Sequence, residues 1–407
     1  MGAVGRRFTF LWLAALTVAV VGAGSAGGAA TPLQQRLAKA LHVPHVSPAR
    51  SGAVVLDLTT GGIVYTQNAS RPLAPASNEK LPLTYAALSV LGPTYRFDTS
   101  VLGIGGQDGT IWGGPLVLQG NGDPTLSTAG LNSLALQVRA GGIRRVTGGI
   151  IADESWFDAR RTVAGWKPSF YLDESPPLSA LVVNRDRVGG YLSTNPALAT
   201  ATAFKTALRG AGITVTGPLR VGTSPDDFAT PLGSVSSPTL ASIIRFMDRE
   251  SDNFTAEMLL KQLGAEELGK GTSAAGASVV THALAAAGVP MTGVRIVDGS
   301  GLSTLDRLTT DALSSLLHSA WNDPAIGPLL RSSLPIAGIN GTLQDRMRRG
   351  PARGHVVAKT GTTSDASALS GFVRNRYAFA ILQNGHPLSY WWARVAQDRF
   401  AQVLAAQ

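Results

Sequence analysis

A serine and a lysine three residues apart, at the start of an expected helix, constrain this chain more than any other feature. Ser77 and Lys80 precede the apolar run Tyr85–Leu88, and residues three apart on a helix share one face. The amine of Lys80 can therefore reach the hydroxyl of Ser77. A serine hydroxyl becomes a good nucleophile only when a neighbouring base takes its proton. The pair thus predicts a helix whose first turn carries a nucleophile and its base.

The same pattern also occurs where serine and lysine only cap and solubilise a helix start, so that interpretation stays open at this point. No second Ser-x-x-Lys occurs in the sequence. Pro82 follows closely and removes a backbone hydrogen-bond donor early in the helix. We therefore expect a local distortion of the helix after Lys80.

The composition excludes several classes of site. The 407 residues are 44% hydrophobic and 15% charged, which indicates a globular chain of two or more domains. Cysteine is absent, so thiol nucleophiles, disulfides and thiolate metal sites are excluded. The six histidines are scattered without metal-ligand spacing, and neither a metal nor an organic cofactor is expected. The net charge of +9 comes mostly from dispersed arginines, so no nucleic-acid partner is expected.

The first 30 residues have the composition of an export segment. Arg6 and Arg7 precede the apolar run Phe8–Val21, and small residues continue to Ala30. This pattern predicts either a signal peptide cleaved within Ala23–Ala30 or an uncleaved anchor that holds the protein at a membrane. In both cases the body is expected outside the cytoplasm, in the periplasm or the cell-wall space.

The patterns of apolar residues and of glycine divide the remaining chain into three parts. Residues 31–96 carry a short helix, a hairpin and the Ser77 helix. Residues 97–236 alternate short strands with glycine-rich turns and include two helical patterns. Because structureless loops of that length are rare, this part is expected to be an inserted β-rich domain. Residues 237–407 return to helical periodicity and end in three strands and a helix, in whose core the pair Trp391-Trp392 is expected to pack.

Two further short motifs follow in order. Ser251-x-Asn253 lies in a tight corner between two helical stretches, and Lys359-Thr360-Gly361-Thr362 follows the start of an expected strand. Ser193-Thr194-Asn195 also matches Ser-x-Asn, but it lies in the expected insert, directly before Pro196. Taken singly, motifs of this kind are more often a helix cap and a strand that ends in a turn.

Together and in this order, the three motifs resemble those of the penicillin-recognising serine enzymes, which are DD-peptidases and serine β-lactamases. Further stretches narrow the resemblance to the penicillin-binding protein 4 class of D-Ala-D-Ala carboxypeptidases, peptidase family S13, which are often also endopeptidases. These stretches are Gly120–Leu126, Asp153–Asp158, Leu178–Asn184, Ser251–Glu257, Asp298–Ser303, Ser333–Gly338 and Gly341–Leu343. The chain passes quickly from Asn184 to Leu198, where larger members carry an additional domain, so it resembles a reduced version.

The resemblance implies an α/β (α+β) fold: an antiparallel sheet flanked by helices, with a helical subdomain and a catalytic cleft between them. It implies that Ser77 attacks a terminal D-Ala-D-Ala bond of a peptidoglycan peptide, and that a neutral Lys80 takes the serine proton. Ser251, assisted by Lys359, would pass a proton to the leaving amine. Water would then hydrolyse the acyl-enzyme. β-Lactams are implied as covalent inhibitors.

The resemblance also implies how substrate is bound. Asn253 would hydrogen-bond the peptide amides, while Lys359, Thr360 and Thr362 would hold the free carboxylate. The backbone N–H groups of Ser77 and Thr362 would form the oxyanion hole, and Gly361 would let the strand backbone approach the substrate.

Two other functions remain open. A β-lactamase would need a deacylating carboxylate, and none stands out. A catalytically weak wall-binding or scaffolding protein could keep the cleft, although the three intact motifs argue against it. The stretch Asp298–Gly301 is expected to be a structural turn near the site rather than a second nucleophile.

Overall fold

The computed structural model describes residues 30–188, 191–223 and 229–407. The predicted signal peptide or anchor falls on residues outside this range. No helix in the described part of the chain is both long and apolar enough to span a bilayer.

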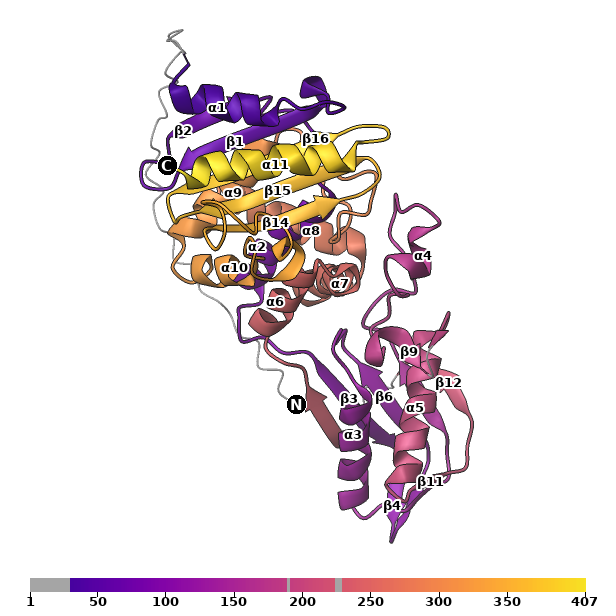
Figure 1. The fold of residues 1–407 in the computed structure, drawn as a ribbon. Helices are drawn as coiled ribbons and strands as arrows, with labels where there is room; N and C mark the ends of the chain where they lie inside the picture. Colours follow the sequence, from indigo (N-terminus) through magenta and orange to yellow (C-terminus); the bar gives the residue numbers. More distant parts are fainter. Residues whose placement is uncertain (1–29, 189–190, 224–228) are drawn as a thin grey trace.

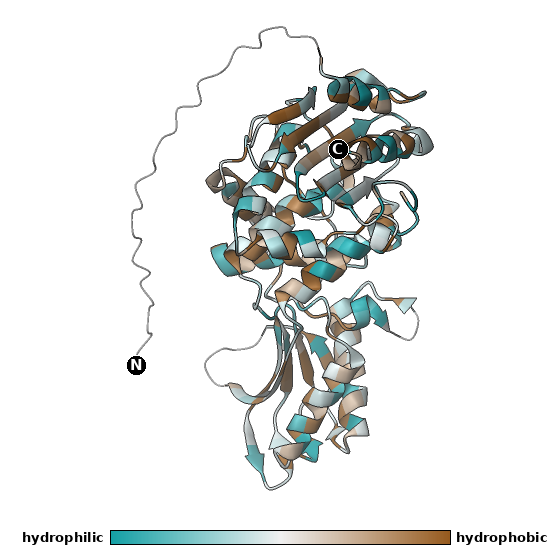
Figure 2. Ribbon diagram, turned by 60° about the vertical axis from the view of Figure 1, so that its left-hand side comes forward, coloured by the Kyte–Doolittle hydropathy of each residue, from teal (hydrophilic) through white to brown (hydrophobic). Residues whose placement is uncertain are grey.

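The larger of two lobes is built on a five-stranded antiparallel sheet of order β14-β15-β16-β1-β2. Its strands are β1 (Ser51–Asp57), β2 (Ile63–Gln67), β14 (Val356–Thr362), β15 (Ala366–Val373) and β16 (Tyr377–Asn384). The central strands β15 and β16 are buried at almost every position, because helices cover both faces of the sheet (Figure 1). Figure 2 shows the same strands as largely hydrophobic between the more polar outer helices.

One face of this sheet is covered by α1 (Pro32–Leu41) and α11 (Tyr390–Ala405), which pack on each other. Phe400 of α11 packs edge-to-face against Tyr65 and in a tilted arrangement against Phe379 of the sheet. The prediction for the tryptophan pair was half wrong: Trp392 packs against this core, but Trp391 is 69% exposed. Adjacent residues on a helix point about 100° apart, so both rings cannot face the same sheet.

The other face is covered by a group of helices that form the helical subdomain. They are α2 (Lys80–Val90), α6 (Leu240–Glu250), α7 (Asn253–Leu268), α8 (Ser273–Ala286), α9 (Thr310–Asn322) and α10 (Gly327–Ser333). The helix α2 is buried along most of its length and α7 along its first three turns, as expected for helices surrounded by other elements rather than by water on one side. Lys80, the first residue of α2, therefore lies inside the protein.

The small lobe contains a five-stranded sheet of order β12-β8-β6-β3-β13. Its strands are β3 (Asp98–Ile104), β6 (Leu116–Gly120), β8 (Ile150–Asp153), β12 (Leu219–Val221) and β13 (Ala229–Ser236). The pairs β6–β8 and β8–β12 are parallel, and parallel neighbours need a crossover connection. The helices α3 (Thr128–Ala140) and α5 (Pro196–Gly210) lie in these crossovers and pack on the sheet. The lobe is therefore mixed α/β, although its short strands were expected from the sequence.

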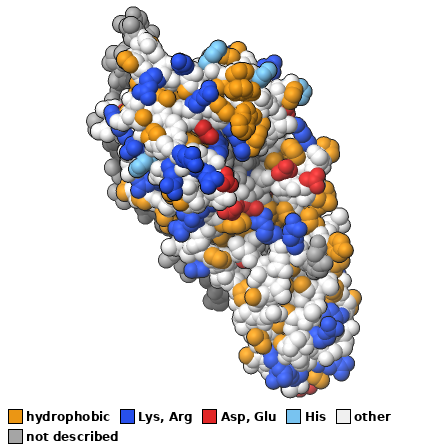
Figure 3. All heavy atoms as spheres, viewed as in Figure 1, with side chains coloured by type: hydrophobic (Ala, Val, Ile, Leu, Met, Phe, Trp, Pro, Cys, Tyr) orange, Lys and Arg blue, Asp and Glu red, His pale blue; other side chains and the backbone are white. Residues whose placement is uncertain are grey.

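A second, four-stranded sheet of order β11-β7-β5-β4 completes the small lobe. It consists of β4 (Gly106–Asp108), β5 (Ile111–Gly113), β7 (Arg145–Val146) and β11 (Thr214–Val215). Between Asn184 and Leu198 the described residues form a 3-10 turn (Asn184–Asp186), the paired strands β9 (Arg187–Val188) and β10 (Tyr191–Leu192), and the start of α5. On the face seen in Figure 3, lysine and arginine side chains are dispersed over both lobes and do not form a continuous basic stripe.

The fold prediction was correct, since the larger lobe is an antiparallel sheet flanked by helices with a helical subdomain. Residues 154–186 run between the two lobes: Phe157 and Leu178 pack against α7, whereas Leu181 and Val183 belong to the core of the small lobe. The ion pair Lys261–Asp158 and the hydrogen bond from Trp166 Nε1 to Asp298 Oδ2 connect the two parts. This segment, which includes the short helix α4 (Phe170–Asp173), borders the cleft described below.

Candidate active site

Ser77 lies on a single turn of 3-10 helix, Ala76–Glu79, that leads directly into α2. Ala76 has a φ of +47°, an unusual conformation for a residue with a Cβ and one that concentrates at functional sites. The prediction of a distorted helix after Lys80 was wrong. Pro82 falls in the first turn of α2, where no backbone N–H has a partner within the helix, so the proline costs no hydrogen bond. The irregular geometry lies before Lys80 instead.

The amine of Lys80 is fully buried and has three acceptors. Nζ donates to Ser77 Oγ at 3.2 Å, to Asn253 Oδ1 at 2.9 Å and to the Ser300 carbonyl oxygen at 2.7 Å. Burial lowers the pKa of Lys80 to about 8, against the opposing effect of nearby carboxylates, Asp298 foremost. An amine with this pKa carries a substantial neutral fraction near neutral pH. It can therefore accept the proton of Ser77.

The turn that presents the Ser300 carbonyl is fixed by buried carboxylates. Asp298 accepts from the backbone N–H of Gly301 and of Ser303, both at 2.7 Å. Glu257 accepts from the N–H of Gly299 and of Ser300, and burial raises the pKa of Glu257 to about 8. Asp298–Gly301 is thus a turn that supports Lys80, and the Ser300 hydroxyl is committed to Asp298.

Ser251 and Lys359 form a second serine–lysine pair. Ser251 ends α6 with a φ of +58°, and this left-handed turn directs the chain into α7. Lys359 Nζ donates to Ser251 Oγ at 2.8 Å and to the Thr360 carbonyl oxygen at 3.0 Å. Burial holds the pKa of Lys359 well below its usual value, the charge of Lys80 lowers it further, and Asp248 opposes both.

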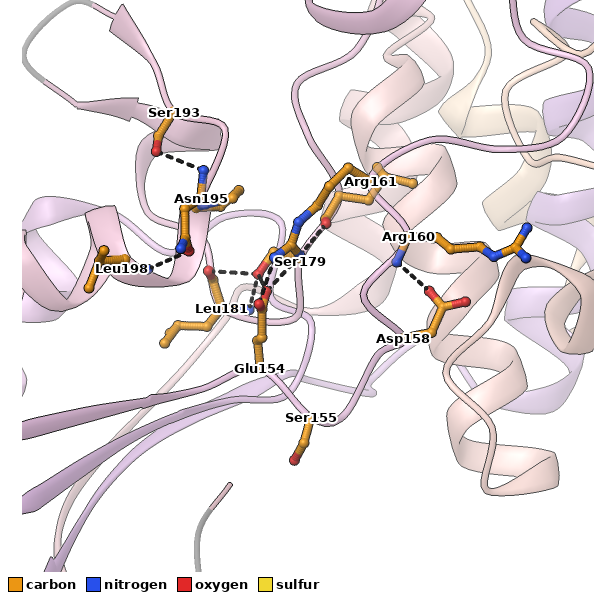
Figure 4. A network of polar contacts seen from close by, with 12 residues as sticks. Glu154, Ser155, Asp158, Arg160, Arg161, Ser179, Leu181, Ser193, Asn195 and Leu198 are labelled. Carbon is orange, nitrogen blue, oxygen red and sulfur yellow. Dashed lines mark hydrogen bonds and ion pairs between the residues drawn. The ribbon is translucent and has the colours of Figure 1, made fainter. Parts of the chain in front are cut away.

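Asn253 begins α7 and connects the two lobes at the site. Its Oδ1 accepts from Lys80, and its Nδ2 donates to the Glu174 carbonyl oxygen at 3.1 Å. The alternative match at Ser193 is placed elsewhere, in the small lobe (Figure 4). There Ser193 Oγ accepts from the Asn195 N–H, and Asn195 caps α5 by accepting from the Leu198 N–H. The second Ser-x-Asn is thus a turn and a helix cap.

The strand β14 packs directly against the turn that carries Ser77. A Cβ added to Gly361 would lie 2.9 Å from the Pro75 carbonyl oxygen and 3.1 Å from Ala76 Cβ, so only glycine permits this approach. Thr360 Oγ1 donates to Thr342 Oγ1 at 2.7 Å, and Thr362 is exposed at the end of the strand.

These residues border one cleft of about 600 Å³. Its lining residues are Ser77, Lys167, Ser169, Phe170, Glu174, Ser251, Asn253, Leu302, Thr342, Thr360, Thr362, Thr363, Ser364 and Arg394. The structure thus brings all eight candidate residues together, with Ser77, Ser251, Asn253, Thr360 and Thr362 at the surface of the cleft and Lys80, Lys359 and Gly361 buried beneath it. In the described part of the chain, no group of three or more His, Asp or Glu side chains is arranged to hold a metal ion.

The sequence did not indicate two walls of this cleft. Lys167, Phe170 and Glu174 come from the segment that returns from the small lobe, and Arg394 comes from α11. The first three lie in a stretch without helical or strand periodicity, so no local pattern marks them. Arg394 lies on an amphipathic helix, where an arginine is most simply expected to face solvent.

The arrangement predicts different outcomes for the two Ser-x-Asn serines. Ser251→Ala removes the hydroxyl that accepts from Lys359 and is expected to slow acylation by fluorescent penicillin by about 10²- to 10⁴-fold, the usual range for loss of a proton-transfer group. Ser193→Ala removes only a turn contact in the small lobe and should leave the acylation rate within about twofold, since such substitutions rarely exceed 0.5 kcal/mol. Stopped-flow labelling measures both rates. The reverse pattern would assign the role to Ser193.

The chain is similar to known proteins in sequence and in fold. The model of the D-Ala-D-Ala carboxypeptidase 3 (S13) family matches residues 33–197 and 188–407. A D-alanyl-D-alanine carboxypeptidase of Actinomadura sp. (strain R39) is 33% identical over 95% of this chain and 88% of its own length. Among solved structures, penicillin binding protein 4 (dacB) of Haemophilus influenzae superposes with a TM-score of 0.79 at 20% identity, over 92% of this chain and 98% of that chain.

A more distant structure has the same fold. It is the penicillin G acylated predatory endopeptidase of Bdellovibrio bacteriovorus, with a TM-score of 0.56 at 19% identity, over 86% of this chain and 90% of that chain.

Proposed function

Because this chain belongs to the D-Ala-D-Ala carboxypeptidase 3 (S13) family, we propose that it removes the terminal D-alanine from peptidoglycan stem peptides through an acyl-enzyme at Ser77. One observation carries the proposal. Ser77 Oγ lies 3.2 Å from Nζ of a fully buried lysine whose pKa is lowered to about 8. Nucleophilic catalysis requires a hydroxyl that substrate can reach and a base that can take its proton. Ser77 at the surface of the cleft and the partly neutral Lys80 meet these two requirements.

In the first half of the reaction, Ser77 Oγ attacks the carbonyl carbon of the penultimate D-alanine and its proton passes to Lys80 Nζ. The C–N bond to the terminal D-alanine then breaks, and the leaving nitrogen takes a proton delivered through Ser251. Lys359 lies 2.8 Å from the Ser251 hydroxyl, which supports this role in proton transfer. In the second half, water attacks the ester and restores Ser77.

Binding is proposed to use the remaining candidates. Asn253 lies at the cleft surface and keeps one Nδ2 proton beyond the one that it donates to Glu174. Thr362 offers a hydroxyl donor at the end of β14, and the Thr360 hydroxyl, which donates to Thr342 here, would turn to the substrate. The backbone N–H groups of Ser77 and Thr362 would stabilise the oxyanion. The close packing that Gly361 permits between β14 and the Ser77 turn supports this arrangement, since both N–H groups must face one oxygen.

We further propose that residues 97–236 are a domain inserted into a peptidase domain of residues 31–96 and 237–407. A separate apolar core in the small lobe supports this division. The export-like composition of residues 1–30 supports a location outside the cytoplasm, where peptidoglycan is found. β-Lactams are proposed as covalent inhibitors, as in the acylated Bdellovibrio endopeptidase.

A second candidate function is cleavage of internal cross-bridge peptides, because the likeness to an endopeptidase extends over most of the chain. The two activities differ in the bond that is cleaved: a carboxypeptidase releases a single terminal D-alanine, whereas an endopeptidase separates two cross-linked stem peptides. Purified muropeptides with pentapeptide stems and with cross-linked stems, analysed by mass spectrometry, would reveal which bond is cleaved. Absence of cleavage in both, with penicillin acylation intact, would favour the scaffolding alternative.

The carboxypeptidase proposal predicts a preference for free acids. A peptide that ends in D-Ala-D-Ala should have a kcat/KM about tenfold to a hundredfold above that of its C-terminal amide, because a hydrogen bond to a charged group contributes roughly 1.5–3 kcal/mol. Thr360→Val combined with Thr362→Val should remove most of this preference while slow acylation of Ser77 persists. Equal rates for acid and amide in the unmodified enzyme would indicate that β14 does not bind a carboxylate.

A further inference from the structure

A carboxylate bound in this cleft needs a positive charge, and three of the four cations at the site are already committed. Lys80 donates to Ser77, Asn253 and the Ser300 carbonyl, and Lys359 donates to Ser251 and the Thr360 carbonyl. Lys167 is paired with Asp365 at 3.0 Å and also donates to Ser364 Oγ. All three amines have their hydrogen-bonding capacity largely used within the protein.

The fourth cation, Arg394, is different. It lines the same cleft as Ser77, Ser251, Thr360 and Thr362. Its guanidinium lies over the ring of Tyr390, 4.0 Å from the centroid, and Nε is buried without a hydrogen-bond partner in the described part of the chain. Because Nε is closed off from the cleft, an anion there would be held by the terminal Nη groups, which form no ion pair with the described residues.

Asp398, the acidic residue of α11, is already paired with another arginine. Asp398 accepts from Nε and Nη2 of Arg346, at 3.0 and 2.6 Å, and Arg346 is itself almost fully buried. Among the described residues, no carboxylate lies within ion-pair distance of Arg394. A second arginine close by adds positive potential without neutralising the first.

From these contacts we propose that Arg394 is a specificity-determining residue that binds the terminal α-carboxylate of the substrate, together with the hydroxyls of Thr360 and Thr362. The inference rests on the proposed function for the identity of the substrate. A guanidinium offers two parallel N–H donors that fit a carboxylate, and its charge does not depend on pH in the physiological range. The stacking on Tyr390 holds the fork in place before substrate arrives, which reduces the entropy cost of binding.

The assignment gives Lys359 a different task from carboxylate binding. Its amine is buried beneath the cleft and held by Ser251 and Thr360, where it can serve proton transfer. Arg394 then supplies a positive charge at the cleft surface that is not lost through proton transfer. A C-terminal amide lacks the charge that Arg394 recognises, so discrimination between acid and amide is expected to depend on this residue.

The test measures binding without turnover. In a Ser77→Ala background, isothermal titration gives the dissociation constants of an acetylated D-Ala-D-Ala peptide and of its C-terminal amide. We expect the acid to bind about tenfold or more tightly than the amide, in line with a charge-assisted hydrogen bond. Adding Arg394→Gln should weaken binding of the acid by about that factor and leave the amide within twofold. Arg394→Lys keeps a charge without the fork and should retain part of the preference.

Arg399→Gln is the matched control. It removes the same charge from the same helix, but Arg399 is exposed and does not line the cleft, so the acid-to-amide ratio should not change. An equal loss for Arg394→Gln and Arg399→Gln would mean that only net charge matters and would overturn the proposal. So would a Ser77→Ala protein that does not prefer the acid. Failure of the proposed function is seen separately, as absent hydrolysis and absent penicillin acylation in the unmodified enzyme.

Discussion

Replacing Ser77 with alanine is expected to abolish covalent labelling by fluorescent penicillin and to lower hydrolysis of a D-Ala-D-Ala peptide by about 10⁴-fold or more. Loss of the nucleophile in a serine protease costs on the order of 10⁶ in kcat, and the activity that remains comes from the oxyanion hole and substrate binding. In this chain, no other hydroxyl combines access to the cleft with a hydrogen bond to Lys80 among the described residues. Gel fluorescence and product release by liquid chromatography measure the two effects.

The control is Ser300→Ala. Ser300 lies close by, but its hydroxyl donates to Asp298 Oδ2 and only its carbonyl contacts Lys80. This variant should keep its label on the peptide that contains Ser77, as mass mapping would verify, with circular dichroism as the check on folding. Persistent labelling of Ser77→Ala, or transfer of the label to Ser300 in the unmodified protein, would refute the assignment of the nucleophile.

Local patterns were sufficient to predict much of this structure. The spacing of apolar residues and the glycine turns indicated the β1–β2 hairpin and most of the long helices, because those signals depend on neighbours in the sequence. The family and the fold were also predicted, from three short motifs in a fixed order, and the family comparison and the structure confirm them. The parallel pairs of the small lobe were not expected, since strand direction depends on the crossovers α3 and α5 rather than on the strands themselves.

In the candidate site, too, only contacts between sequence neighbours could be predicted from local patterns. Ser77 and Lys80 could be paired from the sequence, because two residues three positions apart on a helix lie close together. The contact between Lys359 and Ser251, by contrast, joins residues 108 apart, and only the resemblance to a family suggested it. Lys167 and Arg394 reach the cleft from a loop and from the last helix, and neither position carries a local signature. Residues that complete a site from distant segments become visible only when the chain is folded.

The pH dependence of acylation is the second large effect expected. Only a neutral amine can take the proton of Ser77, and the pKa of Lys80 is about 8 because burial disfavours the charged form. Below that pH the neutral fraction falls tenfold for each unit, so the acylation rate should rise with pH up to about 8 and then level off. Stopped-flow measurements of penicillin acylation between pH 5 and 10 give the profile.

Titration of Glu257 could produce a similar profile, since burial raises its pKa to about 8. Two substitutions distinguish Glu257 from Lys80. Lys80→Arg keeps a positive charge near Ser77, but a guanidinium stays protonated and cannot act as a base. Acylation should fall by about 10²- to 10⁴-fold across the whole range, the contribution typical of a general base. Glu257→Gln can still accept from the Gly299 and Ser300 N–H groups and should keep the rising profile. If Lys80→Arg acylated at nearly the normal rate, Lys80 would act only through its charge. If Glu257→Gln flattened the profile, the titrating group would be the carboxyl and not the amine.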